Sequence, residues 1–234
     1  MSTKSLQNEP EKARRPLAAT LTMLAAALSI LIRLRPHPAN FVPLGAMGIY
    51  GGAKMRGWKP FLMPIAVLVV SDVALWAIAG FDSMYLFHLS RIYVYGSFVI
   101  YVAIGRLLRN RESPLKVCAA SLLGSLQFFV ITNFCTWLLQ PFDALEGVPA
   151  YLVYSRDLAG LWACFVAALP FFQGESPLNL HAIFVGQPSY GVFGLVVGDL
   201  FFTSGLFLLH GALARKAYAA ELPTPQPAVQ ALQH

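Results

Sequence analysis

Charged side chains are scarce in this sequence. Only 12% of its 234 residues are Asp, Glu, Lys or Arg, whereas 57% are hydrophobic. A soluble globular domain usually carries about 25% charged residues, so the composition excludes an ordinary soluble core. The hydrophobic residues come in long runs, without the roughly 10-residue alternation of barrel strands. Because lipid requires every backbone polar group to be paired inside its own segment, the sequence predicts an all-α, polytopic membrane protein.

Cysteine and catalytic motifs are scarce as well. The three cysteines, Cys118, Cys135 and Cys164, lie inside apolar runs without CxxC spacing. We therefore interpret them as small core residues rather than as disulfides or metal ligands. The histidines show no metal-ligand spacing, and no GxxxxGK[ST], HExxH or GxSxG motif occurs. The sequence thus predicts no metal, no cofactor and no enzymatic activity.

The charge that is present is mostly basic, with 17 Lys and Arg against 11 Asp and Glu and a net charge of +6. No nucleic-acid-binding motif accompanies this excess, so we assign it to cytoplasmic loops, where Lys and Arg accumulate. With the N-terminus inside, only Arg33, Arg35, Arg91 and Arg156 fall on outer loops. We expect a multi-pass protein of the cell (inner) membrane with a cytoplasmic N-terminus and no nucleic-acid partner.

We expect the chain to divide into a cytoplasmic polar tail (1–15), a single transmembrane domain (16–213) and a disordered C-terminal tail (214–234). The expected apolar segments are Leu17–Ile32, Phe41–Ala53, Pro60–Ala79, Ile92–Leu108, Leu115–Leu139, Leu158–Phe172 and Tyr190–Leu213. A span needs roughly 20 residues, with a lower limit near 17, and the second and sixth segments are short. We therefore expect six or seven transmembrane helices, and the side of the C-terminus stays open.

Several polar residues share one predicted depth. Asp72 lies 13 residues past Lys59, and Asn133 lies 17 residues past Lys116, which places both roughly 20 to 25 Å above the inner surface. A charge inside the bilayer costs about 2.5–3.5 kcal/mol, so such residues need a role. The remaining candidates on this side are Arg35, His37 and Asn40 in the loop 33–40, Arg91, Trp137 and Asp157. We expect these residues to line a polar pocket beneath the loop, near the extracytoplasmic face.

Structural alternatives exist for these residues. For Asp72 the alternative is an ion pair with Arg91 or Arg35, and for His37 it is a hydrogen bond to a loop carbonyl. Ser121 and Ser125, which share a four-residue repeat with Asn133, favour a helix–helix seam. Asp199 also lies inside an apolar segment, and the sequence does not identify its partner.

Small residues indicate close helix packing. Gly48 and Gly52 have the four-residue spacing that lets helix backbones approach. Ala18, Thr22 and Ala26 form a similar row on the first helix. This row is a candidate face for docking a partner helix, and packing within the protein is its alternative.

Five phrases occur together and in order: PHPANFVPLGAMGIYGGA from residue 36, SD at 71–72, FFVITNFCTW at 128–137, GLWACFVAALPFF at 160–172 and GDLFF at 198–202. Over about residues 33–207 they resemble an uncharacterised family of small multi-pass membrane proteins described as transport proteins (domain of unknown function 6580), which has no established substrate. The stretch 173–189 departs from the family's pattern and leaves the C-terminal topology open.

That family is in turn similar to the substrate-binding S components of energy-coupling factor (ECF) transporters. These are usually six-helix proteins that bind vitamins or other micronutrients near the outer face, under a loop between helices one and two. The resemblance implies that Arg35, His37 and Asn40 belong to this loop. It also implies that the row of Ala18, Thr22 and Ala26 docks a transmembrane coupling subunit with ATPases.

We therefore expect an integral membrane protein that binds or transports a small micronutrient-like solute. Its expected partners are that solute, the lipid bilayer and the coupling subunit. Two other functions are weighed against this one. The first is an assembly or scaffold protein without a solute, which would use its small-residue faces. The second is a small membrane enzyme with His37, Asp72 and Asp157 as acid–base groups.

Overall fold

The computed structural model describes residues 3–35, 40–79, 90–139, 157–167, 169 and 191–221. These residues form seven helices and contain no strand, which confirms the all-α class. The helices are α1 (Thr3–Arg33), α2 (Leu44–Lys54), α3 (Lys59–Ala79), α5 (Ser90–Leu107), α6 (Pro114–Leu139), α7 (Leu158–Ala167) and α9 (Gly191–Glu221).

Four helical stretches are long and apolar enough to cross a bilayer, namely Pro16–Arg33, Lys59–Ile78, Pro114–Leu139 and Val192–Ala217. Large hydrophobic side chains remain exposed along each of them, as Leu31, Val70, Leu126 and Phe201 illustrate. Exposing so much apolar surface to water would be unfavourable, whereas exposing it to lipid is not. Length, composition and exposure together make this a membrane-embedded helical protein.

The described helices give fewer candidate spans than the six or seven expected. Helix α2 has 11 residues and α7 has 10, and both fall short of the roughly 17 residues that a span requires. Helix α5 has 18 residues, but it is not among the four stretches that are apolar enough. Short apolar segments therefore serve here as parts of the helical bundle rather than as clear spans.

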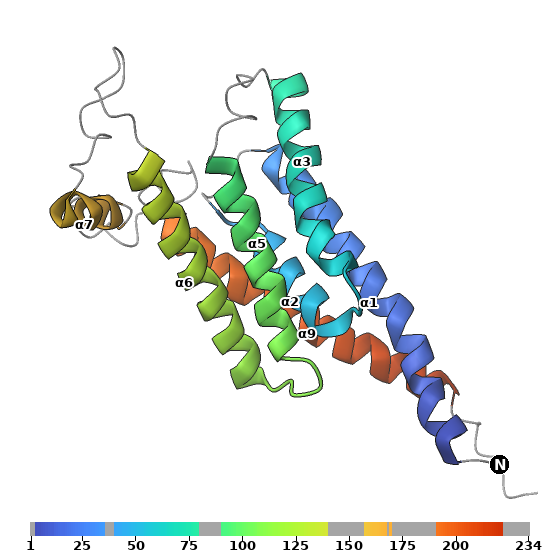
Figure 1. Cartoon of the computed structure of the whole chain (residues 1–234). Coiled ribbons are helices and arrows are strands. Elements are labelled where there is room, and N and C mark those ends of the chain that lie inside the picture. Colours follow the sequence, from blue (N-terminus) through green and yellow to red (C-terminus); the bar gives the residue numbers. More distant parts are fainter. Residues whose placement is uncertain are drawn as a thin grey trace, which may run out of the picture.

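Helix α2 occupies the centre of the bundle. Its 11 residues extend about 16 Å, roughly half of the hydrocarbon core. Every residue from Leu44 to Ala53 is buried, and the helix contacts α1, α3, α5, α6 and α9. In Figure 1, α2 lies between the α1–α3 pair and the α5–α6 pair, and α9 crosses behind it. The second apolar segment is thus the core of the fold.

Glycines allow α2 and α5 to touch through their backbones. A Cβ atom on Gly52 would collide with the Val102 carbonyl, and one on Gly105 would collide with the Ile49 carbonyl. A Cβ atom on Gly48 would lie 3.0 Å from the Tyr101 side chain. The expected close approach at Gly48 and Gly52 is therefore confirmed, and α5 is the helix that approaches.

Two helices extend beyond their expected limits. Helix α1 begins at Thr3 rather than at Pro16, and α9 continues to Glu221 rather than ending at Leu213. Residues 3–15 and 214–221, expected as tails, are therefore helical. The rest of the expected C-terminal tail, residues 222–234, lies outside the described residues.

The small-residue row on α1 faces inward. Ala18, Thr22 and Ala26 are all buried, and a Cβ on Gly51 of α2 would lie 3.6 Å from the Thr22 methyl group. The Thr22 hydroxyl donates to the Ala18 carbonyl on its own helix, at 2.7 Å. In the described structure this face is covered by the chain itself, which favours internal packing over a docking face.

Candidate functional site

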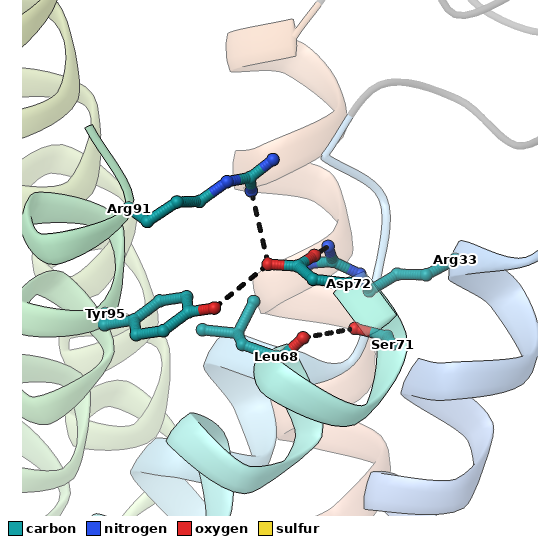
Figure 2. A network of polar contacts seen from close by, with 6 residues as sticks. All are labelled: Arg33, Leu68, Ser71, Asp72, Arg91 and Tyr95. Carbon is teal, nitrogen blue, oxygen red and sulfur yellow. Dashed lines mark hydrogen bonds and ion pairs between the residues drawn. The ribbon is translucent and has the colours of Figure 1, made fainter. Parts of the chain in front are cut away.

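Asp72 is the centre of a polar network that joins three helices. It lies on α3 and is 1% exposed. Arg33, at the end of α1, donates to its Oδ1, and Tyr95 of α5 donates to its Oδ2 at 3.0 Å. Arg91, one turn before Tyr95, places Nη1 3.5 Å from the same Oδ2. Figure 2 shows the two guanidinium groups reaching the carboxylate from opposite sides.

This network satisfies both carboxylate oxygens, which is what a buried charge requires. It confirms the ion pair with Arg91 that the sequence suggested. The second arginine is Arg33 and not Arg35 among the described contacts, because Arg33 still belongs to the last turn of α1 and points along the helix surface toward α3. The Nε atom of Arg33 is buried and has no partner among the described residues.

Asn133 does not belong to the described Asp72 network. Its side-chain amide donates to the Phe129 carbonyl of its own helix, α6, at 2.8 Å. Its backbone carbonyl lies 3.4 Å from the Cys164 sulfur of α7. The ring of Trp137 packs against Phe134, with centroids 5.7 Å apart. The described contacts therefore do not bring Asn133 together with Asp72, and α5 lies between α3 and α6.

The remaining predicted residues are at the edges of the described structure. Asp157 begins α7, because its Oδ1 accepts a hydrogen bond from the Gly160 N–H at 2.8 Å, which is a helix-capping role. Arg35 and Asn40 are exposed, and Asn40 has a φ of 59°, a left-handed conformation that asparagine tolerates. His37 lies outside the described residues.

A second buried carboxylate lies deeper in the bundle. Asp199 of α9 is 2% exposed, and its Oδ2 accepts hydrogen bonds from the Tyr101 hydroxyl of α5 and the Ser125 hydroxyl of α6, the latter at 2.8 Å. Its Oδ1 lies against Gly45 in the first turn of α2, where any Cβ would collide with it. Among the described residues, no cation pairs with Asp199.

The Asp199 cluster explains several features of the sequence. Ser125 was expected in a helix–helix seam, and it lies in the contact between α6 and α9. Thr203, one turn after Asp199, is fully buried, and its hydroxyl has no partner among the described residues. Sequence reasoning noticed Asp199 but missed Tyr101. A tyrosine in the apolar run VIYVAIG could have indicated it, because a buried tyrosine hydroxyl needs a hydrogen-bond partner.

The opposite end of α5 carries a basic cavity. It has a volume of about 570 Å³, and Lys54, Arg109, Glu112 and His210 are among its lining residues. His210 is buried, and its Nδ1 lies 2.7 Å from the Tyr50 hydroxyl. Lys54 forms an ion pair with Glu112 across the cavity wall. The sequence assigned these basic residues to orientation alone and did not predict a cavity here.

These three polar sites are embedded in a bundle whose outer surface is apolar. Ionisable groups inside a membrane are costly, and they mark functional sites or fix helices together. The fold and the buried sites therefore define a membrane-embedded helical protein with ionisable groups in its interior.

The family model of a family of unknown function, DUF6580, matches residues 11–225. The match covers most of the chain, so the protein belongs to this family. No curated protein and no solved structure gave a significant match.

Proposed function

We propose that the protein binds and transports a small, micronutrient-like solute across the cell (inner) membrane, with its N-terminus in the cytoplasm. In this proposal the chain crosses the membrane several times, and the Asp72 network lies at the extracytoplasmic end, beneath the loop 33–40. The solute reaches the bundle at this end. Residues 36–39, including His37, lie outside the described structure, so the loop is assigned to this end only because it follows Arg33 in the sequence.

The observation that carries the proposal is Asp199. A purely structural helix needs no carboxyl group inside its apolar span, where a charge costs about 2.5–3.5 kcal/mol on the most lenient scale. Asp199 has two hydroxyl donors and, among the described residues, no basic partner that would offset this cost. In membrane proteins such carboxyls typically lie on substrate or ion pathways. Asp199 therefore supports transport over a scaffold without a solute.

The arrangement of polar groups along α5 supports the same function. Arg91 belongs to the Asp72 network, Tyr101 to the Asp199 cluster, and Arg109 to the basic cavity just beyond the helix. Successive groups are 8 to 10 residues apart in the sequence, or about 12 to 15 Å along a helix. Polar sites thus recur from one end of the bundle to the other, as a transport pathway requires.

The test begins with identification of the solute. Small molecules released from the purified wild-type protein on denaturation are identified by mass spectrometry, and their uptake into proteoliposomes is measured. We expect Asp199→Asn to lower uptake at least tenfold, because the amide oxygen still accepts both hydrogen bonds while the charge is lost. Gel filtration and circular dichroism check that this variant remains folded.

The matched control is Asp157→Asn, which also replaces one carboxyl group, but at the exposed start of α7. We expect it to transport like the wild type. Equal uptake by the wild type and Asp199→Asn would remove Asp199 from the pathway. A wild-type protein that releases no solute and supports no uptake would contradict the proposal and favour the scaffold function.

A further inference from the structure

The basic cavity lies at a level of the fold that suits a lipid headgroup. Its lining residues Ala18 and Ala19 stand at the beginning of the candidate span Pro16–Arg33. The lining residues Arg109, Asn110 and Glu112 come just before the span Pro114–Leu139, and the lining residues 54–56 come just before the span Lys59–Ile78. The starts of three spans thus surround the cavity. Trp58, beside it in sequence, is 65% exposed, as is typical of aromatic residues at a membrane interface.

Arginine provides the main recognition element of this cavity. Arg109 donates to the carbonyls of Gly52 and Met55, which holds its guanidinium group against the cavity wall. Both hydrogen bonds use Nη2, so the N–H groups of Nη1 and Nε have no partner among the described residues and are available to a ligand. A guanidinium group with parallel donors matches the oxygens of a phosphate.

Lysine adds a second donor. The Nζ atom of Lys54 bonds to Glu112 and lies 5.5 Å from the centre of the Phe207 ring. An ammonium group has three N–H donors, so the ion pair uses only one of them. Arg56 adds a further positive charge to the lining. The lining therefore contains two arginines, one lysine and His210 against one acidic residue, Glu112. The cavity volume of about 570 Å³ is within the usual range for a small-molecule site.

We propose that this cavity binds the phosphate group of an anionic phospholipid of the surrounding membrane. Arg109 and Lys54 contact the phosphate oxygens, Arg56 strengthens the field, and the acyl chains extend along the exposed apolar surface of the neighbouring spans. Basic pockets between helices at the cytoplasmic face bind such headgroups in other membrane proteins. A free phosphate offers the same oxygens, so the test includes both sources.

The test uses the full chain, purified and delipidated in a neutral detergent. Native mass spectrometry counts bound phosphatidylglycerol, and thermal unfolding is followed with phosphatidylglycerol, phosphatidylcholine or inorganic phosphate. We expect one phosphatidylglycerol to be retained and to raise the melting temperature. Arg109→Gln is expected to weaken its binding at least tenfold. Arg56→Gln, at an exposed position that is less important for folding, is expected to weaken it severalfold.

The matched control is Arg111→Gln, which removes the same charge from the same end of the bundle but does not line the cavity. We expect it to bind like the wild type. Equal weakening by Arg111→Gln and Arg56→Gln would show diffuse surface attraction and overturn the proposal, as would equal binding of phosphatidylcholine. Protection by inorganic phosphate alone would support the phosphate site and reject the lipid as its source. No protection of the wild type by either probe would reject the site itself.

Discussion

Replacing Gly105 with alanine tests whether the backbone contact between α2 and α5 holds the fold together. A Cβ at Gly105 would lie closer than 3.0 Å to three backbone atoms of Ile49, whereas a Cβ at Gly96 would meet nothing within 4 Å. Both glycines belong to α5. Gly96→Ala is therefore a matched control that changes the same helix by the same methyl group without a collision.

The expected difference follows from this geometry. Alanine is favoured over glycine in a helix interior by about 1 kcal/mol, and both variants gain this term. Gly105→Ala must also push two backbones apart by roughly 1 Å, and overpacking of this kind costs about 1–3 kcal/mol and occasionally more. Because Ile49 contributes backbone atoms that cannot rotate away, we expect a difference of about 3 kcal/mol, at the upper end of this range.

Thermal unfolding of the purified variants in detergent measures this difference. A change of 1 kcal/mol shifts the melting temperature of a protein of this size by about 2–4 °C. We therefore expect Gly105→Ala to melt about 6–12 °C below Gly96→Ala, and Gly96→Ala to melt at or slightly above the wild type. Equal melting temperatures for the two variants would refute the close backbone contact and with it the central position of α2.

Three further substitutions test the buried polar groups and the start of α7, each by thermal unfolding. Asp199→Leu leaves the buried Tyr101 hydroxyl without its described acceptor, whereas the Ser125 hydroxyl keeps the Ser121 carbonyl. The substitution is expected to cost about 1–3 kcal/mol, so stability equal to that of Asp199→Asn would contradict the cluster. Tyr50→Phe removes the hydrogen bond between the Tyr50 hydroxyl and the buried His210 and is expected to cost about 0.5–1.5 kcal/mol, whereas an unchanged melting temperature would mean that this bond does not stabilise the fold. Asp157→Ala removes a helix cap and is expected to cost about 1 kcal/mol, and hydrogen exchange should increase in α7 alone.

The long apolar helices could be predicted from the sequence. The segment expected at Pro60–Ala79 is the helix Lys59–Ala79, and the one expected at Leu115–Leu139 is Pro114–Leu139. Uninterrupted apolar runs of this length leave few alternatives in lipid. Helix α2 was harder to interpret, because an apolar composition shows that a segment avoids water but not whether lipid or protein covers it. The four glycines of α2 indicated that other helices, rather than lipid, cover it.

The candidate site was predictable only in part. The proximity of Asp72 and Arg91 followed from their expected depth, since both belong to the same end of neighbouring segments. Depth alone does not fix the direction of a side chain around its helix, and the one described side-chain hydrogen bond of Asn133 stays within its own helix. The bond between Asp199 and Tyr101 joins residues 98 positions apart, and no local pattern encodes such a contact.

The buried position of α2 has a consequence for the folding of the protein during its synthesis. As the chain leaves the ribosome, α2 emerges long before α5 and α9, the two neighbours that later enclose much of its surface. It is too short to span the bilayer alone, and its glycines provide no side chains that could pack against lipid. The core around α2 is therefore incomplete during synthesis, and it closes only when α9, the last of these helices, has been made.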